Sequence, residues 1–85
     1  MKNATQKSGR NRYELLKLVK ENNLFNQMVY TGIISLNVAT WFDVYEKYLF
    51  LMNTNNKSNA VFHTAEYFNL TDRTIYRIIN YMESK

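Results

Sequence analysis

Apolar residues recur along most of this chain at the three- and four-residue spacing of an α-helix. The longest such run covers residues 36–52, where apolar positions follow i, i+4, i+7, i+11 and i+14: Val38, Phe42, Tyr45, Leu49 and Met52. This spacing places them on one face of a helix. Trp41 and Tyr48 widen that face, while Val44 and Leu51 lie on another side. We therefore expect a helix that is apolar almost all round and is either central to a bundle or shared with a second subunit.

Polar residues predict where two shorter helices before this one begin and end. Asn11 and Glu14 have the spacing of a capping box, so a helix is expected to start there. Asn22 or Asn23 is expected to cap a second, short helix. Gly32 is expected to close that helix, because glycine adopts the left-handed conformation of a helix C-terminus at little cost.

Two further helices are expected near the C-terminus, on either side of a turn. After a polar, asparagine-rich loop, Ser58 is expected to cap a helix over residues 59–68. Asn69 is expected in the turn, since asparagine tolerates the left-handed conformation better than most residues. Thr71 is expected to cap the last helix, which runs from residue 72 to about residue 83.

Composition favours helices over a turn-rich β fold. The chain has 85 residues, no proline and two glycines, and 46% of it is hydrophobic. A chain of this length forms one small domain. We expect an all-α fold, a small bundle of four to five helices with a C-terminal helix-turn-helix at residues 58–83. The domain is expected to span residues 11–85, after a flexible basic tail of residues 1–10. The side chains expected to be mostly buried are Trp41, Phe42, Tyr45, Leu49, Met52, Phe62, Ala65, Phe68, Leu70, Ile75, Ile78 and Met82.

The positive charge is concentrated at the N-terminus. The net charge is +4; residues 1–12 hold four basic side chains and no acidic one, whereas residues 13–85 hold seven of each. A basic arm suits a polyanion such as nucleic acid, and Arg10 and Arg12 are candidates for entering a minor groove. The alternative is a terminus that only aids solubility.

Several classes of function lack the residues they need. The chain has no cysteine and one histidine, so thiol chemistry and a metal site are not expected. It has no catalytic triad, no paired carboxylates and no glycine-rich phosphate loop. No apolar run reaches the roughly 18 residues of a membrane span, and no apolar stretch follows the charged start as in a signal peptide. We expect a cytoplasmic protein without enzymatic activity, cofactor, metal or membrane contact.

The run AEYFNLTDRTIYRII resembles the helix-turn-helix of bacterial and phage DNA-binding proteins. It is most similar to the Mor-type activators of transposable phages and to the C-terminal domain of serine recombinases. The shared pattern is a small residue, a glycine-like turn, a hydrophobic residue, Ser or Thr, and then Thr-hydrophobic-Tyr-Arg. The residues that match it are Ala65, Asn69, Leu70, Thr71, Thr74, Ile75, Tyr76 and Arg77. The resemblance covers about twenty-five residues, and it implies a recognition helix that lies in the major groove of DNA.

In such domains the first turns of the recognition helix meet base edges. The resemblance thus implies base contacts by Asp72, Arg73, Tyr76, Arg77 and Asn80. Helical periodicity agrees, because these polar residues lie opposite the apolar positions of the same segment. The alternatives are that Arg73 and Arg77 are only solvated and that Tyr76 packs on a second subunit.

Other residues near the turn are candidates for contacts to the DNA backbone. Thr71 and Thr74, together with the backbone N–H groups at the start of the last helix, can hold a phosphate. Lys57 and Ser58 precede the first helix of the pair and are further candidates.

Our leading hypothesis is a sequence-specific DNA-binding protein, either a small transcriptional regulator or an accessory factor of a mobile element. The abundance of Asn, Lys, Ile and Tyr fits an A+T-rich bacterial genome. Since one recognition helix reads few bases, a homodimer through helices 11–31 and 36–52 is expected on double-stranded DNA. The alternative is a protein–protein interaction module that uses the helix-turn-helix only as a scaffold, as the neutral charge of residues 13–85 would suit.

Overall fold

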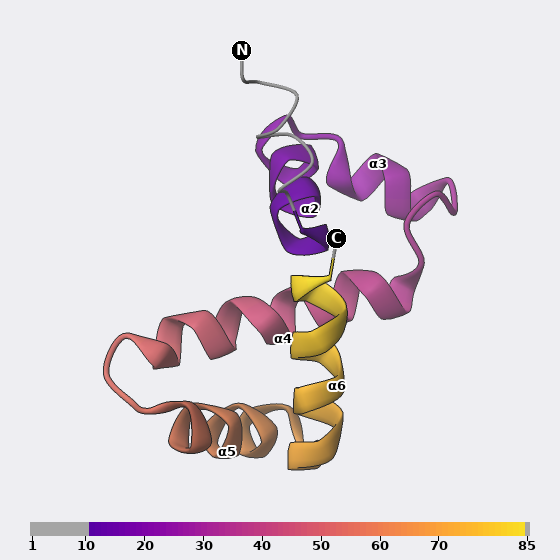
Figure 1. Ribbon diagram of the computed structural model, residues 1–85. Helices are drawn as coiled ribbons and strands as arrows, with labels where there is room; N and C mark the ends of the chain where they lie inside the picture. The colour runs from indigo at the N-terminus through magenta and orange to yellow at the C-terminus, as the bar shows by residue number, and fades with distance from the viewer. Residues whose placement is uncertain (1–10, 85) are drawn as a thin grey trace.

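The computed structural model describes residues 11–84, which form five helices and no strand (Figure 1). The helices are α2 (Arg12–Glu21), α3 (Phe25–Tyr30), α4 (Leu36–Met52), α5 (Lys57–Phe68) and α6 (Asp72–Glu83). The expected all-α bundle of four to five helices is therefore confirmed. The pair α5 and α6 occupies the predicted positions, with three residues between them.

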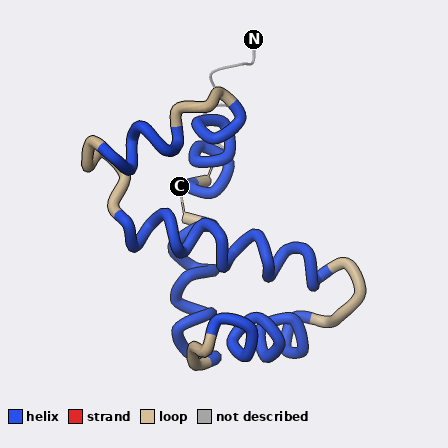
Figure 2. Tube along the Cα trace, turned by 180° about the vertical axis from the view of Figure 1, so that it is seen from behind, coloured by secondary structure: helices blue, strands red, loops and turns tan. Residues whose placement is uncertain are grey.

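The long helix α4 runs through the middle of the molecule. After the loop that follows it, α5 folds back beside α4, and α6 then crosses α4 toward α2 (Figures 1 and 2). Helices α4, α5 and α6 pack against one another, while α2 contacts α6, and α3 packs mainly on α2. The C-terminal three helices thus form the main body, and α2 and α3 are added at one end of it.

The core lies where α4, α5 and α6 meet. Its fully or nearly fully buried side chains are Phe42, Val44, Tyr45, Tyr48, Ala60, Val61, Thr64, Ala65, Ile75, Ile78, Ile79 and Met82. Six of them belong to the set predicted from periodicity, and Trp41, Leu49 and Phe68 of that set are half-buried against the core. Removal of these apolar surfaces from water is the main favourable contribution to folding.

Three residues expected to be buried are exposed. The exposed fraction is 39% for Met52, 49% for Phe62 and 39% for Leu70. Met52 lies in the last turn of α4, at its solvent end, and Leu70 lies in the turn between α5 and α6. Phe62 lies on the outer face of α5, because α5 turns its smaller residues toward the core.

Helix α4 is buried on two sides but not all round. Val44, on the side opposite the predicted stripe, is fully buried because α4 contacts both α5 and α6. Leu36 and Phe50 on the same helix are largely exposed. The prediction that this helix is central to the bundle is confirmed.

Hydrogen bonds at the helix ends confirm some expected caps. The Asn11 side chain accepts from the Glu14 backbone N–H at 2.9 Å, and Glu14 Oε1 accepts from the Asn11 backbone N–H at 3.0 Å. This is the predicted capping box. Gly32, just after α3, has the expected left-handed φ of +88°.

Two expected caps are wrong. The chain enters α3 through Leu24 without a side-chain cap, and Asn23 instead ends α2 with a left-handed φ of 63°. Asn56 rather than Ser58 caps α5, accepting from the Asn59 backbone N–H at 2.9 Å. Asparagine suits both an N-cap and a left-handed turn. An asparagine-rich loop therefore contains several residues at which the next helix can begin.

Two tyrosine–glutamate hydrogen bonds tie α4 to its neighbours. Tyr13 Oη of α2 donates to Glu46 Oε2 of α4 at 3.0 Å. Tyr45 Oη of α4 donates to Glu83 Oε2 of α6 at 2.8 Å. The second bond holds the C-terminal end of α6 against the long helix.

Candidate nucleic-acid interface

The turn between α5 and α6 is set by local backbone geometry. Asn69 has φ 58° and ψ 48°, the left-handed conformation predicted for it. The Leu70 N–H donates to the Ala65 carbonyl at 2.8 Å, and the Asn69 N–H donates to the Glu66 carbonyl at 3.2 Å. This pair of bonds is the Schellman motif, which ends a helix and satisfies its last carbonyls.

The start of α6 is held by Thr71, as expected. Its Oγ1 accepts from the Thr74 backbone N–H at 3.2 Å, and the two hydroxyl oxygens lie 3.0 Å apart. Asp72 places a carboxylate in the first turn, where the helix dipole favours negative charge. The Thr71 and Thr74 hydroxyls therefore lie together at the N-terminus of α6.

Small side chains let α5 approach its neighbours closely. Ala60, Thr64 and Ala65 are buried along the inner face of α5. The Thr64 hydroxyl donates to the Ala60 carbonyl at 2.7 Å, so its burial leaves no unpaired polar group. This packing fixes how α6 is presented relative to α5.

Helix α6 is divided into an apolar face and a polar face. Its buried residues are Ile75, Ile78, Ile79 and Met82. On the opposite face lie four exposed residues at the spacing i, i+3, i+4 and i+7, here called the α6 polar stripe: Arg73, Tyr76, Arg77 and Asn80. Asp72 is exposed beside its N-terminal end. The structure thus brings together, on one surface, all five residues that the resemblance implies for base contact.

Neither arginine of the α6 polar stripe has a carboxylate partner within residues 11–84. In that part of the chain one contact within 4.0 Å between a basic nitrogen and a carboxylate oxygen is found, between His63 and Glu66 on α5 at 3.8 Å. The two guanidinium groups lie at i and i+4 on an exposed helix face, so they point the same way. Their donors are available to an external acceptor.

Lys57, at the start of α5, lies next to the α6 polar stripe. Its Nζ is 5.8 Å from the centroid of the Tyr76 ring, within the range of a cation–π contact. Ser58 is exposed on the same first turn of α5. Lys57, one of the residues expected to contact the DNA backbone, is thus brought beside α6 by tertiary packing.

Arg12 lies elsewhere. Its guanidinium is 4.5 Å from the centroid of the Tyr81 ring, and Nη1 donates to the Tyr81 carbonyl at 3.3 Å. Its backbone N–H donates to the Ser84 carbonyl at 2.9 Å. Arg12 is therefore bound at the C-terminal end of α6, about 18 Å along a twelve-residue helix from its start. Arg10 and the rest of the predicted tail lie outside the described residues.

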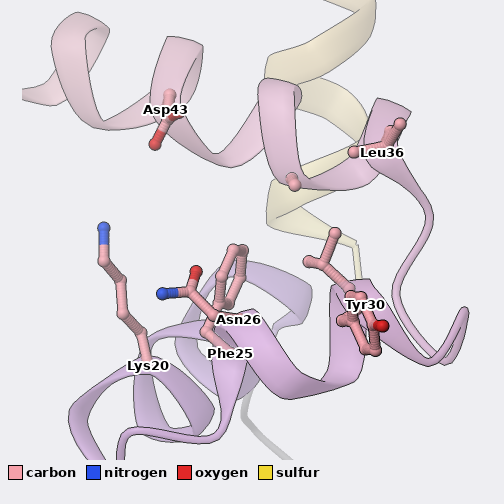
Figure 3. Close-up of a pocket in the computed structure, with 8 residues that line it drawn as sticks. Lys20, Phe25, Asn26, Tyr30, Leu36 and Asp43 are labelled. Carbon is pink, nitrogen blue, oxygen red and sulfur yellow. The ribbon is translucent and has the colours of Figure 1, made fainter.

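The sequence pattern did not reveal a second feature, a groove between α3 and the first half of α4 (Figure 3). It has a volume of about 670 Å³, and Lys20 and Asp43 lie on its walls. No pattern in the sequence relates these two residues, because they belong to different helices and come near one another only in the folded chain.

Residues 11–84 contain neither a cluster of metal ligands nor a membrane-spanning helix. No group of three or more His, Asp or Glu side chains there is placed to hold a metal ion. No helix in that part of the chain is long and apolar enough to cross a bilayer.

In the described part of the chain, the protein is a small all-helical domain of five helices. Comparisons with models of protein families, with curated proteins and with solved structures find no match.

Proposed function

We propose that the protein binds double-stranded DNA in a sequence-specific manner and acts as a small transcriptional regulator or as an accessory factor of a mobile element. Helix α6 lies in the major groove, which is wide enough to admit an α-helix. The protein acts by occupying its site, without catalysis. The resemblance of residues 58–83 to bacterial and phage helix-turn-helix proteins points the same way.

The observation that carries this proposal is the α6 polar stripe. Arg73 and Arg77 are exposed side by side and have no carboxylate partner in residues 11–84. A helix that only covers a core gains nothing from two adjacent unpaired cations, since like charges at i and i+4 destabilise it slightly. A polyanionic ligand removes that penalty.

Each residue of the surface has a chemical role in this proposal. Arg73 and Arg77 bridge guanine O6 and N7, and Asn80 bridges adenine N6 and N7. Asp72 accepts from a cytosine amine, and Tyr76 lies between the bases and Lys57. The Lys57 amine and the hydroxyls of Ser58, Thr71 and Thr74 contact phosphates, which positions the helix without carrying sequence information.

A random-duplex selection with the full-length protein at physiological salt tests the proposal. We expect an enriched motif, and we expect Arg77→Ala and Arg73→Ala each to change the preferred base at one position. The matched control is Lys17→Ala, which removes an exposed positive charge from α2, a helix outside the α5–α6 pair. No enrichment by a folded protein would overturn the proposal.

A second candidate function is a protein–protein interaction module. It is favoured by the balance of seven basic and seven acidic side chains within residues 11–84 and by large exposed apolar residues on α2, α3 and α4. Salt separates the two functions, because DNA binding weakens steeply with salt through counterion release and apolar association does not. Removing one phosphate contact, as in Lys57→Ala, is expected to lower the salt slope by about 1.

A further inference from the structure

The most exposed large apolar side chains lie on α3, in the connection to α4 and at the start of α4. This end of the molecule is away from the α5–α6 turn (Figure 1). The exposed fraction is 92% for Tyr30, 71% for Ile33 and 74% for Leu36. None of the residues of α3 is buried. This is the least covered apolar region in the described part of the chain.

Helix α3 is too short to be stable without tertiary contacts. It has six residues and packs mainly on α2, whereas isolated helices shorter than about 12 residues are marginal in water. Its apolar side chains are therefore expected to gain further contacts from another molecule. An uncovered patch of this kind is typical of an interaction site.

The groove beside α3 carries one positive and one negative charge on opposite walls. The Lys20 amine and the Asp43 carboxylate point toward one another across it (Figure 3). The two groups do not form an ion pair, because the distance from the Lys20 nitrogen to the Asp43 carboxylate oxygens exceeds 4.0 Å. Lys20 Nζ instead lies 5.0 Å from the ring centroid of Phe42. The rest of the groove is lined mostly by apolar side chains, which include Phe25, Val29 and Leu36.

We propose that a second copy of this chain covers α3 and the groove, in a twofold interface where Lys20 of each copy faces Asp43 of the other. Every contact in a twofold interface occurs twice. A twofold axis that passes between Lys20 and Asp43 therefore brings each charge opposite its counterpart in the other copy, and it sets the apolar side chains of the two copies against one another. The apolar side chains supply the affinity, and the two ion pairs set the register.

The role of this dimer rests on the proposed function, because a dimer presents two α6 helices, which read two half-sites. The helices that build the interface, α2, α3 and α4, leave the exposed face of α6 uncovered. Association itself is measured without DNA, so it is tested separately from base recognition.

Sedimentation equilibrium of the full-length chain over a concentration series tests the apolar part. We expect a monomer–dimer equilibrium, and we expect Tyr30→Ala to weaken it at least about tenfold, as for an aromatic side chain that becomes buried in an interface. The control is Tyr67→Ala, which removes an exposed tyrosine from α5 and is expected to leave the equilibrium unchanged. A wild-type protein that stays monomeric at high micromolar concentration would overturn the proposal, as would equal effects of the two substitutions.

Charge reversal tests the proposed pairing. Lys20→Glu places two carboxylates opposite each other in both of the proposed pairs, and Asp43→Lys places two amines there. Each variant alone is expected to associate at least about tenfold more weakly than the wild type, since like charges in an interface repel. An equimolar mixture of the two variants is expected to form heterodimers, because every opposing pair is then of opposite sign.

Two controls keep this experiment decisive. Lys17→Glu makes the same charge change elsewhere on α2 and is expected to leave association unchanged, and the helical circular dichroism of every variant shows that it folds. Weak association of both single variants without recovery in the mixture contradicts the pairing. A monomeric protein that enriches a DNA motif without twofold symmetry would support DNA recognition and contradict the dimer. A dimeric protein that enriches no DNA motif would support the dimer and contradict DNA recognition.

Discussion

Single hydrogen-bonded tyrosines join the helices of this protein. Tyr13 and Tyr45 each donate to a glutamate of a different helix, Glu46 and Glu83. Burial, followed by the hydrogen bond to Glu46, raises the pKa of Tyr13 to about 12. Burial and the bond to Glu83 raise the pKa of Tyr45 as well, and burial raises the pKa of Tyr48. The hydrogen bonds that Tyr13 and Tyr45 donate exist only while these phenols are protonated.

These raised pKa values predict a loss of stability in alkali. An unfolded tyrosine ionises near its ordinary pKa of 10.0, whereas folded Tyr13 ionises near 12. The contribution is therefore complete below pH 10 and is lost as the pH rises toward and through 12. We expect the free energy of unfolding, measured by urea denaturation at a series of pH values, to fall across this window. Tyr13→Phe is expected to make the fall shallower, while Tyr67→Phe, whose tyrosine is exposed, serves as the control; identical profiles for the two would contradict this assignment.

At the scale of the element, the ends of the helices are determined by a few local bonds. Asn69 ends α5 in the left-handed conformation, and Thr71 begins α6 two residues later. Together they set a three-residue turn, which is the length of a helix-turn-helix connection. The orientation of the α6 polar stripe depends on this turn being maintained.

Substitution of Asn69 tests the importance of its backbone conformation. Asn69→Ala is expected to lower the free energy of unfolding by about 1 kcal/mol, because a Cβ without a polar partner is strained in the left-handed region. Asn69→Gly is expected to be neutral or stabilising, since glycine adopts this conformation freely. Thermal or urea unfolding measures both. Equal destabilisation by alanine and glycine would show that the side chain matters rather than the backbone.

The N-cap of α6 is a separate contribution at the same scale. Thr71→Ala removes the acceptor of the Thr74 N–H and is expected to cost about 1 kcal/mol of stability. Thr71→Ser keeps an acceptor oxygen and is expected to retain most of it. A urea denaturation series of the three proteins measures the difference; a serine variant as unstable as the alanine variant would exclude the cap as the cause.

At the scale of the whole molecule, stability is unevenly distributed. The buried residues belong almost entirely to α4, α5 and α6, whereas neither α2 nor α3 has a buried residue. Regions with few buried apolar contacts open at lower free energy than the core. The end that carries the proposed dimer surface is thus the less stable end of the monomer.

Hydrogen exchange tests this distribution. Among the described helices, the amides of α3 are expected to exchange fastest and those of α4 and α6 around Phe42 and Ile78 slowest. Dimerisation is expected to slow exchange in α3 as the protein concentration rises, while α6 remains unchanged. Mass spectrometry of exchanged peptides at two concentrations measures both effects. Slow, concentration-independent exchange in α3 would mean that contacts within one chain already stabilise it.

The sequence by itself determined the features that depend on neighbours three or four residues apart. The helical periodicity, the capping box at Asn11, the left-handed Asn69 and the N-cap at Thr71 are all of this kind. The division of α6 into two faces also follows from its periodicity, so the candidate DNA-binding surface was predictable as a set of residues. Its contact with DNA remains a prediction.

Tertiary structure decided what depends on residues far apart in the chain. Phe62 and Leu70 are exposed although they are apolar, because no other helix covers the surface on which they lie. Arg12 is held by Tyr81 at the far end of α6, and Lys20 faces Asp43 across a groove. Local spacing cannot determine such contacts, since burial and pairing depend on which helix faces are brought together when the chain folds.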